Sequence, residues 1–301
     1  MRNYKNVNLW HVVFPLIFLG VFSYPFLSQD FFNYLFDAKI ATFYFKNPYL
    51  HKALDFPGDP WLRFTQWTHR TYPYGPAFLL ISLVPSFLSF GKFLLAFLFF
   101  KATSALFYVS GVYYLSKLDK KWAVIFATNP LVLTEGLVSS HNDLIGVSLA
   151  IVGIYYLFAK RNILGRVFLL LSAGIKYITL PLVFLSKTIK QYNHIAIFGL
   201  CAILAYLSFF SEIQPWYFLA LFAALPFYEK FISKLNIFFA GLLFSYYPYV
   251  RFGGWDKAWK IALKHQIIIA FVVLNAVILL FKFFYKVVLN KVKLRFPGGV
   301  A

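Results

Sequence analysis

The stretch NPLVLTEGLVSSHND, residues 129–143, precedes an apolar helical segment, which is followed by KRN at 160–162 and AGIKYITLP at 173–181. A carboxylate and a histidine therefore stand at the end of one apolar segment, and Lys176 lies inside a later one. An unpaired charge deep in a membrane costs a few kcal/mol, so such a residue is expected to have a function or a partner. We predict that this stretch forms part of an active site.

The composition is typical of a membrane protein. Of the 301 residues, 61% are hydrophobic, 22% are aromatic and 13% are charged, more apolar surface than a soluble domain could bury. The formal charge of +19 fits anionic lipid headgroups and positive cytoplasmic loops, and no basic run is long enough to indicate nucleic-acid binding. The single cysteine excludes an internal disulfide. We expect an all-α, polytopic transmembrane helical bundle, with one domain over residues 1–295 and a disordered tail at 296–301.

The distribution of basic residues predicts the topology, because positive loops stay in the cytoplasm. Both chain ends are expected there, and the first span is expected over residues 9–27. Further spans are predicted at 93–116, 122–140 and 144–159, which places residues 141–143 on the same outer face as Asp30. Further basic clusters that we assign to the cytoplasm lie at 117–121, 160–166, 187–190, 230–234 and 282–295.

Two segments are too short for the crossings that this topology would require. Residues 77–90 fall below the roughly 20 residues that a span needs, so we expect an interfacial or re-entrant piece. Residues 163–186 begin and end in cytoplasmic charge and must cross an even number of times. A broken, re-entrant pair with Lys176 near its apex satisfies this constraint, and irregular backbone at such depth is tolerated where it lines a cavity.

The long first outer loop, residues 30–76, is rich in aromatic residues and turn formers. Apolar residues spaced three and four apart at its start predict a helix that lies in the membrane interface. Asp30 begins that helix, and Asp37, seven residues later, shares its face. Long aromatic loops of this kind often carry function.

Each polar residue also has a structural explanation that the sequence leaves open. Asp30 and Asp143 could serve as N-caps of the helices that follow them. His141 could be an interfacial histidine, Lys176 could snorkel toward lipid headgroups, and Arg251 could bind headgroups nonspecifically. Taken together, however, carboxylates, cations and aromatic rings suit sugar transfer from a lipid phosphate. A carboxylate takes the acceptor's proton, and cations stabilise the charge on the departing phosphate.

Six short motifs follow one another along the chain: Asp30-(x)3-Tyr34, Tyr72-Pro73-Tyr74-Gly75-Pro76, Asn129-Pro130, His141-Asn142-Asp143, Gly174-Ile175-Lys176-Tyr177 with Pro181, and Gln214-Pro215-Trp216-Tyr217. In this order they resemble the motifs of the C-type (GT-C) integral-membrane glycosyltransferases. The likeness covers about residues 9–230 and is closest to the polyprenyl-phosphate-mannose-dependent mannosyltransferases.

This resemblance implies roles for several residues. Asp30 would be the catalytic base, His141 and Asp143 would position a substrate, and Lys176 would contact the lipid phosphate. The family inverts the sugar carbon and generally needs no cofactor, although some branches bind a divalent metal between loop carboxylates.

From the residues and the resemblance together we expect a hexosyltransferase, with no metal, whose active site faces outward. It would move mannose from a polyprenyl-phosphate donor to a hydroxyl of a glycan or glycolipid. A lipid-linked-sugar flippase or other secondary transporter is the alternative, and a noncatalytic scaffold is a third. Besides Asp30 as the base, the expected substrate-binding residues are Tyr34, Asp37, Tyr74, His141, Asn142, Asp143, Lys176, Tyr177, Gln214, Trp216 and Arg251.

Overall fold

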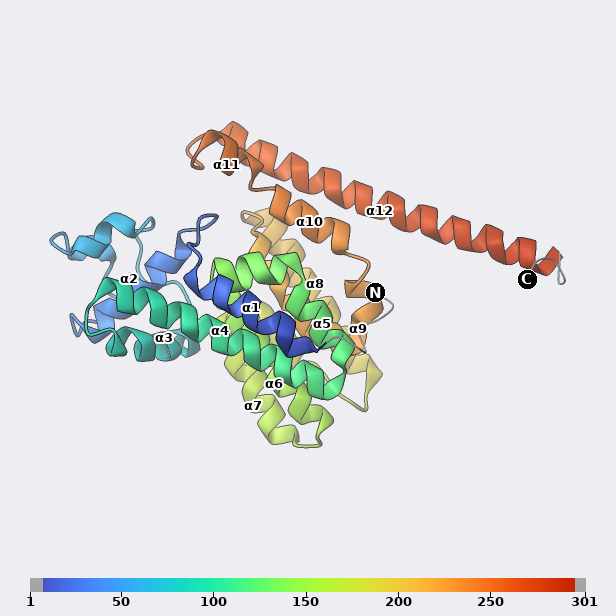
Figure 1. Cartoon of the computed structure of the whole chain (residues 1–301), viewed down its shortest axis with the longest axis horizontal. Helices are drawn as coiled ribbons and strands as arrows, with labels where there is room; N and C mark the ends of the chain where they lie inside the picture. The colour runs from blue at the N-terminus through green and yellow to red at the C-terminus, as the bar shows by residue number, and fades with distance from the viewer. Residues whose placement is uncertain (1–7, 296–301) are drawn as a thin grey trace. The chain divides into compact units, whose positions relative to one another are not determined.

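The computed structural model describes residues 8–295, and the regular secondary structure in this range is helical (Figure 1). The disordered tail predicted for 296–301 lies outside the described residues. The helices are α1 (Leu9–Phe22), α2 (Asp30–Thr42), η1 (Ala53–Asp55), η2 (Pro60–Phe64), α3 (Pro76–Leu88), α4 (Phe93–Leu118), α5 (Lys120–Thr128), η3 (Val132–Val138), α6 (Asn142–Phe158), α7 (Asn162–Ile175), η4 (Tyr177–Phe184), α8 (Lys190–Phe210), η5 (Pro215–Ala224), α9 (Leu225–Ile232), α10 (Asn236–Phe244), α11 (Tyr247–Phe252) and α12 (Ala258–Arg295).

Within residues 8–295, three helices are long and apolar enough to cross a membrane: α4, α8 and the part of α12 from Ala258 to Tyr285. A fourth span results if η3 and α6, which meet at a bend of 107°, count as one broken span. Helices α1, α3 and α7 are apolar but shorter. The expectation of an all-helical membrane protein is therefore confirmed.

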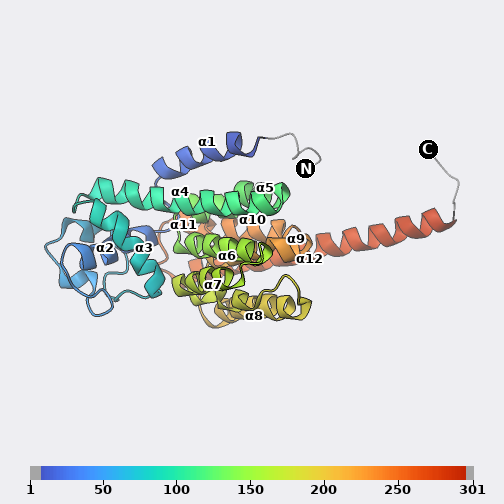
Figure 2. The same cartoon turned by 90° about the horizontal axis from the view of Figure 1, so that it is seen from below.

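The described residues form two compact units, which are divided between Glu229 and Lys230. In the first unit, α1 packs on α4, α4 on α6, α6 on α7, and η4 between α7 and α8. Figure 2 shows these helices as successive layers, with α2 and α3 at one end of them. In the second unit, α10 and α11 pack against α12, and exposed apolar side chains such as Ile269 and Phe281 suit contact with lipid tails.

Local sequence signals set several of the helix boundaries. The Asp119 side chain accepts the Lys121 N–H (2.7 Å) and caps α5 where α4 ends. Helix α5 ends before Asn129-Pro130, because the residue before a proline is disfavoured in helical conformation. The predicted span over residues 122–140 is therefore divided into α5 and the π-helix η3.

The broken segment predicted over residues 163–186 is present. Helix α7 ends at Ile175, Lys176 is extended (φ −155°, ψ 129°), and the chain continues as the 3₁₀ helix η4. Helix η4 packs back against α7. Lys176 thus lies at the junction of the two arms, as the sequence predicted.

Helix α1 is shorter than the first span that we expected over residues 9–27. It ends at Phe22, and Ser23 and Tyr24 lead into Pro25, which cannot continue the helix. The amide of Ser23 still closes the last turn through the Gly20 carbonyl (3.4 Å).

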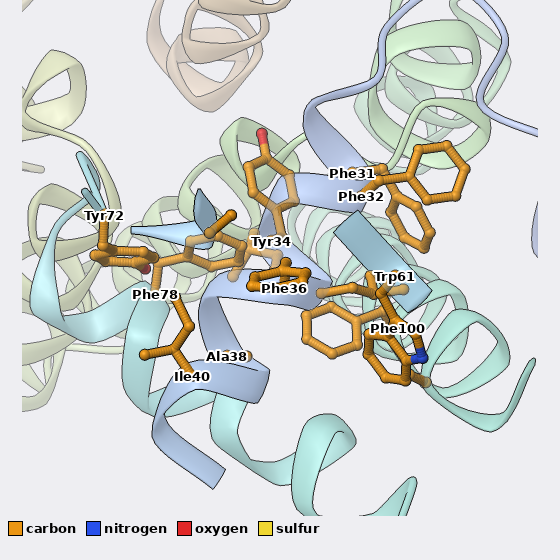
Figure 3. Packing of buried hydrophobic residues seen from close by; sticks show 14 of the residues in the cluster. Phe31, Phe32, Tyr34, Phe36, Ala38, Ile40, Trp61, Tyr72, Phe78 and Phe100 are labelled. Atoms are coloured by element: carbon orange, nitrogen blue, oxygen red, sulfur yellow. The ribbon is translucent and has the colours of Figure 1, made fainter. Parts of the chain in front are cut away.

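Helix α2, for which the sequence predicts a position in the membrane interface, is buried within the protein. All ten of its residues from Phe31 to Ile40 are buried, because η1, η2, α3 and α4 pack around it. Figure 3 shows the aromatic packing around the helix, where the rings of Phe31 and Phe100 are 6.4 Å apart and those of Tyr34 and Phe78 are 5.0 Å apart. The first outer loop and α2 therefore form an aromatic core of their own at the end of the layers.

A buried ion pair closes this loop core at the C-terminal end of α2. Lys39 Nζ lies 2.5 Å from the Asp59 carboxylate, which also accepts the Tyr44 hydroxyl (2.7 Å) and the Trp61 N–H (2.8 Å). Burial alone would raise the pKa of Asp59, but these donors outweigh it and lower that pKa. The loop is thereby held against the helix that carries Asp30.

Candidate functional site

Asp30 occupies the first turn of α2, where the positive end of the helix dipole favours a carboxylate. Its backbone N–H donates to the Ser28 hydroxyl (3.3 Å), and its Oδ1 accepts the indole N–H of Trp67 (3.1 Å). Among the residues that the structure describes, no protein donor reaches Oδ2. The carboxylate is thus held on one oxygen, and the other is available for a proton.

Lys176 pairs with Asp143 across two elements. Its Nζ donates to Asp143 Oδ2 at 2.8 Å, with the two side chains 17% and 5% exposed. Asp143 belongs to the first turn of α6, and the α6–α7 contact is fixed beside it by Ser172, whose hydroxyl donates to the Gly146 carbonyl (2.6 Å). Lys176 Nζ also lies 4.7 Å from the centre of the Tyr217 ring, a distance that suits a cation–π contact.

His141 is fully buried and contacts the site through Trp216 without lining the cavity. Its ring stacks on Trp216 with the centroids 3.9 Å apart and the planes at 17°. One ring nitrogen, Nε2, is 3.3 Å from Glu135, and the other, Nδ1, is 3.4 Å from the Tyr34 hydroxyl. His141 therefore links η3, α2 and η5. The neighbouring Asn142 is also buried, and its side-chain amide has no hydrogen-bond partner among the described residues.

A glycine contact docks the outer loop against the junction that carries Lys176. The Gly75 N–H donates to the Ile175 carbonyl (3.2 Å). A Cβ added at Gly75 would overlap the carbonyl oxygen of Gly174. The motif at residues 72–76 thus brings Tyr74 next to Lys176, because only glycine allows this close approach.

One cavity of about 550 Å³, within the range of small-molecule sites, joins these elements. It receives residues from α2, the first outer loop, the junction of α7 with η4, and η5. The lining residues are Asp30, Trp67, Arg70, Pro73, Tyr74, Gly75, Pro76, Ala173, Gly174, Ile175, Lys176, Tyr177, Ile178, Leu207, Gln214, Trp216 and Tyr217.

The predicted site residues divide by their distance from this cavity. Those that line it are Asp30, Tyr74, Lys176, Tyr177, Gln214 and Trp216. Three more contact a lining residue without lining the cavity themselves. The Tyr34 ring packs on Tyr74, the His141 ring stacks on Trp216, and Asp143 pairs with Lys176. Asn142 lies buried between His141 and Asp143. Asp37 lies deeper along α2, and Arg251 lies in α11 of the second unit.

The lining residues that the sequence did not predict include three with large polar or aromatic side chains: Trp67, Arg70 and Tyr217. Tyr217 is the last residue of the motif at residues 214–217, so the sequence contained a signal for it. Trp67 and Arg70 lie between turn formers in the outer loop, and only the fold shows that they turn toward Asp30.

The lining provides a carboxylate, two cations and several aromatic rings. Burial raises the pKa of Tyr74 well above its ordinary value, so its hydroxyl stays protonated as a hydrogen-bonding group. In the described part of the chain, no three His, Cys, Asp or Glu side chains are grouped so that they could hold a metal ion. The geometry thus suits proton abstraction beside a bound anion.

Comparison with known proteins identifies the family. Residues 5–189 match the family described as alpha-(1->6)-mannopyranosyltransferase, N-terminal domain. Comparison with curated proteins and with solved structures gave no match. The match covers α1 to η4 and so includes Asp30, Asp143 and Lys176. The chain therefore belongs to the alpha-(1->6)-mannopyranosyltransferase family and is a membrane glycosyltransferase of the mannosyltransferase class.

Proposed function

We propose that the protein transfers mannose from a polyprenyl-phosphate donor to a hydroxyl of a glycan or glycolipid, in a GT-C-like manner. One observation carries the proposal: Asp30 and Lys176, the partner of Asp143, line the same cavity, although they lie near opposite ends of the matched region. Carboxylate and ammonium are the two groups that transfer from a lipid phosphate requires.

In this mechanism Asp30 accepts the proton of the acceptor hydroxyl while that oxygen attacks the anomeric carbon. The bond from this carbon to the phosphate oxygen breaks, and its electron pair stays on the polyprenyl phosphate. Lys176 then stabilises the added negative charge. Attack opposite the leaving group inverts the anomeric configuration, and no cofactor is needed.

The aromatic lining fits the two substrates. Trp216, Tyr217 and Tyr74 offer apolar ring faces to the C–H groups of a sugar. The exposed Tyr177 and the lining Leu207 on α8 provide an apolar side for a polyprenyl chain. With basic clusters in the cytoplasm, as the sequence predicts, the cavity faces outward and both chain ends lie inside.

The test is transfer of radiolabelled mannose from polyprenyl-phosphate-mannose in membranes that carry the wild type or Asp30→Asn. We expect the variant to lose roughly a hundred- to ten-thousandfold in rate, the range for removal of a general base. Asp55→Asn, at an exposed carboxylate of the same loop outside the cavity lining, serves as the matched control and should retain activity.

Two outcomes would contradict the proposal. Full activity of Asp30→Asn would remove Asp30 as the base. Movement of the lipid-linked sugar across the membrane without transfer to any hydroxyl would favour the transporter alternative.

A further inference from the structure

Arg70 provides the cavity with positive charge that no carboxylate offsets at short range. Lys176, the other lining cation, lies 2.8 Å from the Asp143 carboxylate, which offsets much of its charge. Among the described residues, no Asp or Glu oxygen lies within ion-pair distance of Arg70. An anion in this cavity is therefore attracted more strongly by Arg70 and Lys176 together than by Lys176 alone, whose charge Asp143 partly offsets.

The electrostatic influence of Arg70 reaches the walls of the site. Burial raises the pKa of Asp37 to about 7 and raises the pKa of Tyr74, and in both cases the positive charge of Arg70 opposes the rise. Arg70 is half-buried, so less solvent screens its charge than would screen an exposed arginine.

The turn from Trp67 to Arg70 is fixed by α2 itself. Asn33, three residues after Asp30, accepts the backbone N–H of Trp67 through its side-chain oxygen (3.2 Å). The Arg70 N–H donates to the Trp67 carbonyl (3.4 Å), and its guanidinium lies 5.0 Å from the centre of the indole ring. A guanidinium stacked on an aromatic face keeps its N–H edge free for two-point binding of an oxyanion.

We propose that Arg70 binds the phosphate of the lipid-linked donor together with Lys176, and that Trp67 is the positioning residue that connects this cation to Asp30. The same indole that stacks under the guanidinium donates its N–H to the Asp30 carboxylate (3.1 Å). Binding of the phosphate and orientation of the base thus depend on one side chain. This inference rests on the proposed function.

The direct test is the affinity of the purified full chain, in phosphatidylcholine nanodiscs, for polyprenyl monophosphate, measured by tryptophan fluorescence. Arg70→Met should raise the dissociation constant about tenfold or more, as expected for loss of a charge-assisted pair. Arg70→Lys should restore only part of the affinity, because an ammonium cannot bind two phosphate oxygens in one plane.

Arg63→Met is the matched control. Arg63 lies in the same loop and stacks on Phe64 (4.8 Å), but it does not line the cavity. We expect the affinity of the Arg63→Met variant for polyprenyl monophosphate to equal that of the wild type. Phosphatidylglycerol and inorganic phosphate, added as competitors, distinguish a site for polyprenyl phosphate from one for any headgroup or free phosphate.

Trp67→Phe separates positioning from folding. This variant keeps a ring under Arg70 and removes the N–H that Asp30 accepts, so kcat should fall about tenfold while the affinity for polyprenyl monophosphate stays within twofold. Replacement of Trp67 by benzothienylalanine, which exchanges the N–H for sulfur at constant shape, should have the same effect. A purely structural role would lower affinity and kcat together.

The inference is overturned if Arg70→Met binds polyprenyl monophosphate as the wild type does, or if phosphatidylglycerol competes equally. It is also overturned if Trp67→Phe leaves kcat unchanged. Failure of the proposed function gives a different result. In that case binding would still depend on Arg70, but the wild type would transfer no mannose.

Discussion

Lys176 and Asp143 illustrate at the residue scale how a buried charge becomes tolerable and useful. Their ion pair, at 2.8 Å with little exposure, satisfies two groups that would each be costly alone. An incoming phosphate would compete with Asp143 for the ammonium. In the proposed mechanism, Lys176 then stabilises the charge that grows on the leaving phosphate.

Asp37 gives a prediction about pH. Burial, opposed by Arg70 and reinforced by Asp30, raises the pKa of Asp37 from 3.8 to about 7. Between pH 4 and 7 the folded protein keeps this proton and the unfolded chain loses it, so the free energy of unfolding falls as pH rises through this window. We expect the wild-type unfolding midpoint to be lower at pH 8 than at pH 4.

Asp37→Asn cannot ionise, so its unfolding midpoint should lack this part of the decline. At pH 8 the variant should be the more stable protein, by up to about 4 kcal/mol if the whole shift is expressed. Thermal unfolding in detergent at a series of pH values measures the difference. An identical pH dependence of the unfolding midpoint in both proteins would show that folding does not raise the pKa of Asp37.

The sequence could single out Asp30, Asp143 and Lys176 as candidates because each is a charged residue in or beside an apolar segment. It could not predict the partners of another buried lysine. Lys101 in α4 is even more deeply buried than Lys176, yet its ammonium donates to the Leu137 carbonyl (3.2 Å) and the Val138 carbonyl (2.5 Å) at the end of η3. Its partners lie in a helix some 36 residues further along the chain, so the sequence around Lys101 does not indicate them.

At the scale of elements, the junction of α7 with η4 depends on how closely the outer loop can approach it. Gly75 has ordinary extended dihedral angles (φ −70°, ψ 157°), so its requirement for glycine is purely steric. The backbone of Gly174 fills the space where a Cβ would stand.

Gly75→Ala should therefore push the loop away from Ile175 and displace Tyr74 and Lys176 from each other. We expect a loss of about 1–3 kcal/mol in stability, the usual range for overpacking, together with lower transferase activity. Gly58→Ala in the same loop is the control, since a Cβ at Gly58 meets nothing within 4 Å. Unchanged unfolding and transfer in Gly75→Ala would show that this contact does not organise the site.

Local sequence patterns predicted the break between α7 and η4 but not the burial of α2. The basic residues at both ends of residues 163–186, and the shortness of this segment, predicted the break near Lys176, since charge and length can be read directly from the sequence. The sequence pattern of α2 predicted a position on a membrane surface, because its apolar spacing resembles that of an interfacial helix. Burial of α2 results from η1, η2, α3 and α4 folding over it, and the sequence of α2 contains no information about these neighbours. The turn at residues 67–70 was missed for the same reason.

At the scale of the whole molecule, the first unit contains the complete cavity, and the family match extends over residues 5–189 of it. Gln214, Trp216 and Tyr217 close the cavity from beyond the matched region. Long apolar helices such as α4 and α8 supply the membrane-embedded frame. We propose that this frame holds a general base, Asp30, and a phosphate-binding cation, Lys176, around one cavity.

The most direct measurement is a cryo-EM map of the full chain in lipid nanodiscs with a nonhydrolysable analogue of polyprenyl-phosphate-mannose. We expect the phosphate to lie within about 3 Å of Lys176 Nζ, a hydrogen-bonding distance, with the sugar between the phosphate and Asp30. A phosphate bound away from Lys176, or a sugar that does not approach Asp30, would show that these residues do not have the proposed roles.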